Sequence, residues 1–393
     1  MIDRVVFALT AAALASAAGG QVGVQPPEPD APARFETPFF VVNEPARPAT
    51  LASGAPIMLE CQSIWKPVCG TPAGKVAAQD LAGMSTSHAA EFAPGAPIRI
   101  VDTPALPGPY QPRTNINIVY VLGASVPAAA VPAFAAAEQY IEAQFTDPIT
   151  VTVSVSFANL GPGVLGGTGS TYGYVTYANS RAGLVAGMDA DDTIQSFLPT
   201  GTTVPVRYKG SNSRVTNENR VFWTIANFNA TAGSAAGNAA SMQYSNTFPF
   251  DYDPSNGVSG SAYSFQDVVI HETGHALGFT SGADFRNSDL ELLDLFRFQR
   301  TDGTGDYNPD TTAEFQVRPR LVSYNSPNDD HNSDLISVEY RMSDGSPNQA
   351  SHFRDQTPPI GIMDPTLGYG QTFYPNFFLS SDLTMFDAIG YDR

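Results

Sequence analysis

Residues 271–282 read HETGHALGFTSG, and this stretch constrains the fold and the chemistry of the chain most strongly. On an α-helix, positions i and i+4 project from the same face, so His271 and His275 can present ring nitrogens to one metal ion. Glu272 is offset by about 100° around the helix axis, which places its carboxylate beside the ion rather than on it. Two imidazoles with an adjacent carboxylate are typical of a zinc site in which the carboxylate accepts a proton from water. The pattern therefore predicts zinc, with Glu272 as general base.

The sequence around the motif favours one helix over residues 264–278. Ser264 is placed to cap its N-terminus, and Gly278 can end it in a left-handed backbone conformation. A buried pair of helical histidines can also be ordinary core, but the consistent context favours a metal site. The apolar residues on both sides of the histidines are Val268, Val269, Ile270, Ala276 and Leu277.

A zinc site needs a third protein ligand, and the chain contains only five histidines. Ser281 stands where a shorter form of the motif would place that ligand. His88 lies before the first clear strand, and His331 lies in the polar stretch NDDHNSD, which favours a solvated turn. His352, in QASHFRDQ, is therefore the favoured candidate.

Carboxylates remain alternatives for the third ligand. Asp284 is the nearest one after the helix and could ligate if the chain turned back at once. Glu291 or Asp294, within SDLELLDLF, which can also form a second helix, would complete the two-histidine, one-carboxylate set of thermolysin-type enzymes. The residues leave these choices open.

HETGHALGF, followed after a long insertion by SHF and then GIMDP, resembles the metzincin zinc proteases, specifically their leishmanolysin-like branch. It is also similar to secreted bacterial metalloproteases with the same HETGHALGF and IMDP pairing. The resemblance covers roughly residues 111–393 and implies a secreted zinc endopeptidase that hydrolyses peptide bonds with a zinc-activated water. Carried across residue by residue, it implies metal ligation by His271, His275 and His352, Glu272 as general base, and Met363 as the methionine of a turn beneath the zinc.

A rival from a different class is a catalytically inactive secreted zinc-binding or adhesion protein built on a protease fold. The intact Glu272 favours the enzyme, because a degenerate site often loses its base first. Another rival keeps the chemistry but uses Asp284 or Glu291 as the third ligand.

Five further features have weaker interpretations. Met363 can be ordinary core, although its Gly- and Pro-bounded segment favours the turn. Tyr369 could stabilise an oxyanion, and Asp387 could orient a ligand histidine, with packing or solvation as the alternatives. The acidic loops at 251–257 and 302–310 could hold calcium, but both lack the full spacing of a calcium loop, and turn chemistry explains them.

The rest of the chain predicts an α+β fold. Residues 115–123 are strand-like, with β-branched and aromatic residues alternating, and residues 149–160 alternate as a half-buried strand. Between them, residues 131–145 have apolar residues at helical spacing. Further strands are expected at 172–179, 220–228, 294–299, 318–324 and 336–342, a short helix at 191–200, and a closing helix at 380–390 with Ser380 or Ser381 at its cap.

Together with the resemblance, this order implies a metzincin-like catalytic domain over 111–393. Its upper part, 111–278, would hold a twisted mixed sheet and the motif helix. Its lower part, 279–393, would be irregular and β-rich, with the methionine turn and the C-terminal helix.

The N-terminus predicts export. Within residues 1–18, Arg4 precedes an apolar run and Ala15-Ser16-Ala17 is typical of a signal-peptide cleavage site. Residues 19–110 are interpreted as a leader or pro-region, since they begin rich in Pro, Ala and acidic residues.

Cys61 and Cys69 are the only cysteines. In an exported chain, a pair this close predicts a disulfide that closes a small loop. The alternative is a propeptide thiol that occupies the zinc and keeps an enzyme latent.

The net charge of −18 over 393 residues argues against nucleic acid as a partner, because phosphates require clustered Lys and Arg. It suits a protein dispersed outside the cell, in the extracellular space or the periplasm. No later segment approaches the length of a transmembrane helix. We expect a monomer that acts on protein or peptide substrates.

Overall fold

In the computed structural model, the described residues all lie within residues 34–393. Side chains are described for residues 91–92, 97–102, 115–190, 192–206, 215–231, 237–282, 290–297, 312–313, 342–343, 348–355 and 357–393. The backbone alone is described for short strands at 40–42, 47–50, 56–59, 62–64, 66–67, 321–322 and 340–341. The predictions that lie outside these ranges are the signal peptide 1–18, the Cys61–Cys69 disulfide, the alternative ligands His88, Asp284 and His331, and the loop 302–310.

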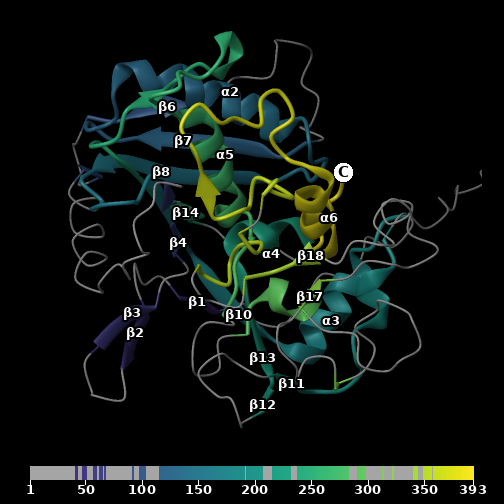
Figure 1. Cartoon of the computed structure of the whole chain (residues 1–393). Helices are drawn as coiled ribbons and strands as arrows, with labels where there is room; N and C mark the ends of the chain where they lie inside the picture. The colour runs from purple at the N-terminus through teal and green to yellow at the C-terminus, as the bar shows by residue number, and fades with distance from the viewer. Residues whose placement is uncertain are drawn as a thin grey trace, which may run out of the picture. The chain divides into compact units, whose positions relative to one another are not determined.

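The principal sheet has six strands in the order β4-β9-β14-β8-β7-β6 (Figure 1). The central strands β14, β8 and β7 are parallel, whereas β6, β9 and β4 are antiparallel to their neighbours. The sheet is therefore mixed, as predicted. Its strands are Gln62–Ile64 (β4), Gly166–Ser170 (β9), Ala240–Ser245 (β14), Thr150–Ala158 (β8), Asn117–Leu122 (β7) and Arg99–Val101 (β6).

Strand β8 is more buried than its alternating sequence predicted. Val151, Val153 and Val155 are buried on one face, and Ser154 and Ser156 are buried on the other. The two serine hydroxyls are accommodated because they bond to side chains of the adjacent strand β14. The strand itself is confirmed, but the prediction that it is half-buried was wrong, because its second face is also buried, at Ser154 and Ser156.

Two 12-residue helices contact each other and the sheet: α2 (Val131–Glu142) contacts β7, and α5 (Phe265–Ala276) contacts β9. Aromatic rings fill the space between these layers. The Phe134 and Phe265 ring centroids are 5.4 Å apart, and both rings pack against Tyr244 of β14. Such edge-to-face contacts favour burial of the motif helix on the sheet.

Two predicted strands end early and continue as helices. Strand β10 (Tyr172–Thr176) is followed by α3 (Tyr177–Ala186), and β13 (Arg220–Thr224) by α4 (Ile225–Thr231). In both cases the last strand residue is a threonine whose hydroxyl accepts a backbone N–H three residues later. This local bond is a helix-capping interaction, and it overrides the β-propensity of the following residues.

The lower part is built from short elements. The predicted strand 294–299 is wrong where it is described, and the alternative of a helix within 288–296 is closer, because Leu292–Phe296 forms a 3₁₀ helix, η4. The carboxylate of Asp294 accepts the backbone N–H of Glu291 and so stabilises the first turn of η4. The closing helix α6 (Ser380–Ala388) forms as predicted, but its first turn is capped by Asp382, which accepts the N–H of Leu379 at 2.8 Å.

The remaining elements complete an α+β architecture with few helices. Among the described residues, no helix is long and apolar enough to cross a lipid bilayer. The other strands are Phe40–Val42 (β1), Arg47–Thr50 (β2), Pro56–Leu59 (β3), Lys66–Pro67 (β5), Val204–Val206 (β11), Thr216–Glu218 (β12), Phe250–Asp251 (β15), Tyr263–Ser264 (β16), Leu321–Val322 (β17), Tyr340–Arg341 (β18) and Thr366–Leu367 (β19), and the other 3₁₀ helices are Ala128–Ala130 (η1), Ile194–Phe197 (η2) and Pro254–Asn256 (η3).

Candidate metal centre

Helix α5 places the first two histidines as the sequence predicted. His271 and His275 are fully buried, and their Nε2 atoms lie 3.0 Å apart. The helix ends at Ala276, and Gly278, two residues later, has a φ of +111°, in the left-handed region that glycine favours. The N–H of Gly278 donates to the carbonyl of His275, and the N–H of Phe279 donates to that of Gly274. This pair of bonds is the Schellman motif, so the predicted glycine stop is confirmed.

His352 joins these two histidines from the lower part. The ligating nitrogens that the three rings can offer all lie within 4.8 Å of one another, and all three side chains are buried. The ring centroid of His352 is 5.2 Å from that of His271 and 5.0 Å from that of His275. The structure therefore brings together the three histidines that the resemblance named. Neither Glu291 nor Asp294 belongs to this group.

Backbone carbonyls orient the imidazoles. The Nδ1 atom of His271 lies 2.7 Å from the carbonyl oxygen of Ile362, and that of His275 lies 2.6 Å from the carbonyl oxygen of Phe279. An Nδ1–H that donates to a carbonyl leaves the Nε2 lone pair for a metal. The second contact follows from the turn at Gly278, because that turn brings Phe279 back towards the helix.

Burial keeps the first two rings neutral. Desolvation lowers the pKa of His271 to about 3, although its bond to Ile362 raises it. Desolvation also lowers the pKa of His275 well below its usual value, and the neighbouring His271 and His352 lower it further. Neutral imidazole is the form that binds a metal ion.

The group fits a tetrahedral metal ion. Two nitrogens each about 2.0–2.1 Å from a zinc ion would lie roughly 3.3 Å apart at tetrahedral angles, close to the 3.0 Å between the Nε2 atoms of His271 and His275. Three imidazoles suit zinc and related divalent metals. A buried His271, His275 and His352 cluster could therefore hold a metal ion.

Strand β9 holds the carboxylate of Glu272. The hydroxyl of Thr168 lies 2.7 Å from Oε2 of Glu272 and 3.0 Å from its backbone carbonyl oxygen. At Gly166, a β-carbon would lie 3.0 Å from Oε1 of the same carboxylate and 3.1 Å from Cγ1 of Val268. The strand therefore approaches the helix closely because glycine has no side chain there. Neither β9 residue was anticipated from the sequence, since nothing local connects them to the motif.

Met363 packs directly against the helix between the two motif histidines. It is fully buried, and a β-carbon at Gly274 would lie 2.6 Å from its sulfur. The backbone of the turn is held by Asp382 of α6, whose carboxylate accepts the N–H of Ile362 at 2.9 Å and of Met363 at 3.0 Å. A β-carbon at Gly361 would lie 2.3 Å from this carboxylate. The GIMDP segment therefore needs its glycine for the approach of Asp382.

Asp382 is a site residue that the sequence analysis missed. Burial raises the pKa of its carboxyl to about 7, while bonds from the N–H groups of Met363, Leu379 and Ile362 lower it. Through Ile362, it supports the carbonyl that accepts from His271. The sequence cue was an acidic residue in the first turn of the closing helix, which is also the ordinary cue for a helix cap.

Two weaker candidates make contacts with residues other than the three histidines. Tyr369 stacks on Tyr263 with ring centroids 4.2 Å apart, and 44% of it is exposed. Asp387 is buried in α6, and its backbone carbonyl accepts from the Gln195 side chain at 3.2 Å.

The carboxylates of the loop at 251–257 bond to its own backbone. Asp251 accepts the N–H groups of Asp253 and Ser259, and Asp253 accepts that of Ser255. These bonds are the turn chemistry expected of aspartates in a short loop.

Comparison with known proteins adds no family: no family model, curated protein or solved structure matches this chain.

Proposed function

We propose that this chain is a zinc-dependent endopeptidase with a metzincin-like catalytic domain. The observation that carries the proposal is the buried group of His271, His275 and His352 with Glu272 on the same helix. The helix supplies two nitrogens and a carboxylate, and the lower part supplies the third nitrogen. A catalytic zinc typically has three protein ligands and an open position, whereas a structural zinc has four protein ligands.

A zinc ion bound by the three histidines would lower the pKa of a water molecule to about 7 and polarise the scissile peptide carbonyl. Glu272 would accept a proton from the attacking water and pass it to the leaving amine. The hydroxyl of Thr168 donates to Oε2 of Glu272 and so orients the carboxylate for this role. Such general acid–base catalysis contributes about 10²–10⁴-fold to a rate.

The backbone contacts of the histidines keep the site pre-organised. Ile362 and Phe279 accept from the Nδ1 atoms of His271 and His275, so neither ring must rotate before it binds a metal. A pre-organised donor set favours tight binding because little conformational entropy is lost.

Replacing Glu272 with Gln tests the proposal. The variant should retain one equivalent of zinc and lose hydrolysis of casein by a factor of at least about 10². Glu142→Gln, at the end of α2, is the matched control. The Glu142 carboxylate accepts the N–H of Ile118 at 2.9 Å, and the side-chain oxygen of glutamine can accept the same N–H. Full activity of Glu272→Gln would overturn the mechanism.

The inactive alternative is decided in the same assay. If the wild-type protein binds zinc but shows no casein hydrolysis that a chelator abolishes, the chain is a zinc-binding protein and the enzymatic proposal fails.

A further inference from the structure

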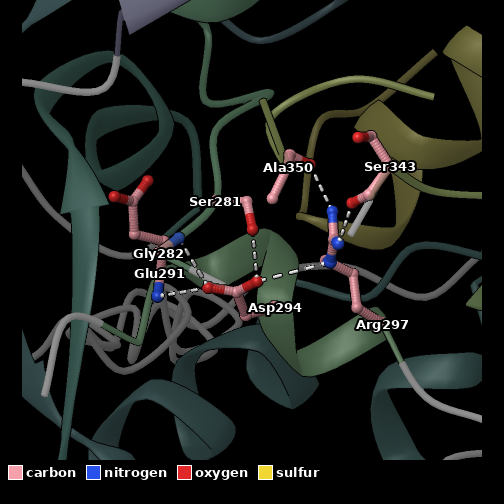
Figure 2. A network of polar contacts seen from close by, with 7 residues as sticks. All are labelled: Ser281, Gly282, Glu291, Asp294, Arg297, Ser343 and Ala350. Atoms are coloured by element: carbon pink, nitrogen blue, oxygen red, sulfur yellow. Dashed lines mark hydrogen bonds and ion pairs between the residues drawn. The ribbon is translucent and has the colours of Figure 1, made fainter. Parts of the chain in front are cut away.

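Asp294 and Arg297 form a buried ion pair in the lower part of the chain (Figure 2). Nε of Arg297 is 3.5 Å from Oδ1 of Asp294, and only 1% and 0% of the two side chains are exposed. A guanidinium is costly to bury unless its charge is paired and its N–H groups are bonded. The bonds of Arg297 therefore indicate what the pair holds in place.

Both ends of the guanidinium reach the segments that carry His352. Nη1 donates to the carbonyl of Ala350, two residues before His352, and Nη2 donates to the carbonyl of Ser343 at 2.5 Å (Figure 2). Ser343 in turn donates its N–H to the carbonyl of His352 at 2.9 Å. An antiparallel bridge between Met342 and Phe353 joins the same two segments. One arginine thus bonds to both of the segments that this bridge joins, and one of them carries the third histidine.

Asp294 connects this arginine to the end of the motif. Its Oδ1 accepts the hydroxyl of Ser281 at 2.6 Å, and its Oδ2 accepts the N–H of Gly282 at 2.9 Å (Figure 2). Ser281 occupies the position at which the shorter motif would have a ligand. The residue that replaces that ligand therefore begins a chain of contacts, through Asp294 and Arg297, that ends beside His352.

We propose that the Asp294–Arg297 pair positions His352 for metal binding. The pair links Ser281 and Gly282, which follow the motif helix, to the segments that hold His352. It thereby fixes His352 relative to the helix that carries the other two histidines. Neither residue touches the metal or a substrate, so both are positioning residues. The inference rests on the proposed zinc site.

The test is the zinc affinity of folded protein, measured by competition with a chelator. Arg297→Met keeps much of the apolar stem and removes the guanidinium, and it should weaken zinc binding about 10–100-fold, as loss of residues that orient metal ligands does. Arg181→Met is the matched control, because Arg181 also donates to two backbone carbonyls, those of Leu198 and Ser196. It should leave the zinc affinity unchanged. Equal affinities of Arg297→Met and wild type would overturn the inference.

A double-mutant cycle with His352→Ala separates positioning from a general loss of structure. In the His352→Ala background, Arg297→Met should cause no further loss of zinc affinity, because the histidine it acts through is gone. An equal loss in both backgrounds would contradict the inference.

If Arg297→Met does not fold, the zinc affinity of Arg297→Lys is measured in its place. A lysine keeps the charge but lacks the planar fork, so it should also weaken zinc binding. Wild-type zinc affinity in this variant would overturn the inference. Absence of zinc binding by the wild type itself would contradict the proposed function, which is a different result from unchanged binding by the arginine variants.

Discussion

The sulfur of Met363 lies against the backbone of Gly274, so closely that a β-carbon at Gly274 would come within 2.6 Å of it. Gly274 stands between His271 and His275 in the motif. Alanine would favour the helix by about 1 kcal/mol, so the glycine is locally unfavourable. The close approach of the methionine turn explains why it is nevertheless there.

Gly274→Ala should therefore destabilise the protein despite its higher helix propensity. The added methyl group displaces Met363 and with it the turn that supports His271, so both the melting temperature and the zinc affinity should fall. Calorimetry and chelator competition measure the two effects.

The double variant Gly274→Ala, Met363→Ala is the control for this steric explanation. Its free energy of unfolding should fall by less than the sum of the falls in the two single variants. The reason is that the added methyl group occupies part of the space that the methionine side chain leaves. Additive effects would contradict the explanation.

Asp382→Asn should weaken zinc binding without changing any ligand. The carboxylate accepts N–H groups from Ile362, Met363 and Leu379, whereas an amide offers a single acceptor oxygen. At least one buried N–H is then left unsatisfied, at a cost of about 1–3 kcal/mol in unfolding free energy.

Asp387→Asn is the matched change on the same helix. We expect it to leave the zinc affinity near that of the wild type. If Asp387→Asn weakened zinc binding and Asp382→Asn did not, the support of the turn would have to be reassigned.

Thr168→Val should lower catalysis while zinc remains bound. Loss of the hydroxyl removes the donor that orients the Glu272 carboxylate, so kcat/KM should fall about 10–100-fold. Thr171→Val removes a comparable bond, to the carbonyl of Asn238 at 2.8 Å, away from Glu272. A matching loss of activity in this control would indicate a general rather than a local effect.

Asp147 predicts a pH dependence of stability in the metal-free protein. Burial, and then the nearby charge of Asp392, raises the pKa of its carboxyl from 3.8 to about 7. The folded state thus binds this proton more tightly than the unfolded state. The stabilisation is complete below about pH 4 and is lost as the pH rises through about 7.

Asp147→Asn cannot ionise but can still accept the N–H of Asp392, which lies 3.1 Å from Oδ2 in the wild type. Its melting temperature should fall less between about pH 5 and about pH 8 than that of the wild type. Asp253→Asn, on an exposed loop, serves as control. Parallel pH profiles for the wild type and Asp147→Asn would refute this account.

Local sequence was sufficient for the motif helix and for its end. The spacing of His271 and His275 puts them on one face of any helix, and Gly278 stops that helix by a backbone conformation. The parallel strands β7 and β8 were also predicted, because their composition favours strands. The helices α3 and α4 were missed, since one threonine hydroxyl at the start of each outweighs the β-propensity of the residues that follow.

Tertiary structure decided which other residues complete the site. The histidine count favoured His352, but only the tertiary structure places its ring beside His271 and His275. The same structure directs the Asp294 carboxylate to Ser281. Thr168 and Asp382 had no cue connecting them to the motif, because each reaches it from a distant element, β9 or α6. Helical periodicity relates residues a few positions apart, whereas contacts between elements depend on packing and on where glycines permit close approach. The motif helix could therefore be predicted from the sequence, and the surroundings that hold its side chains in place could not.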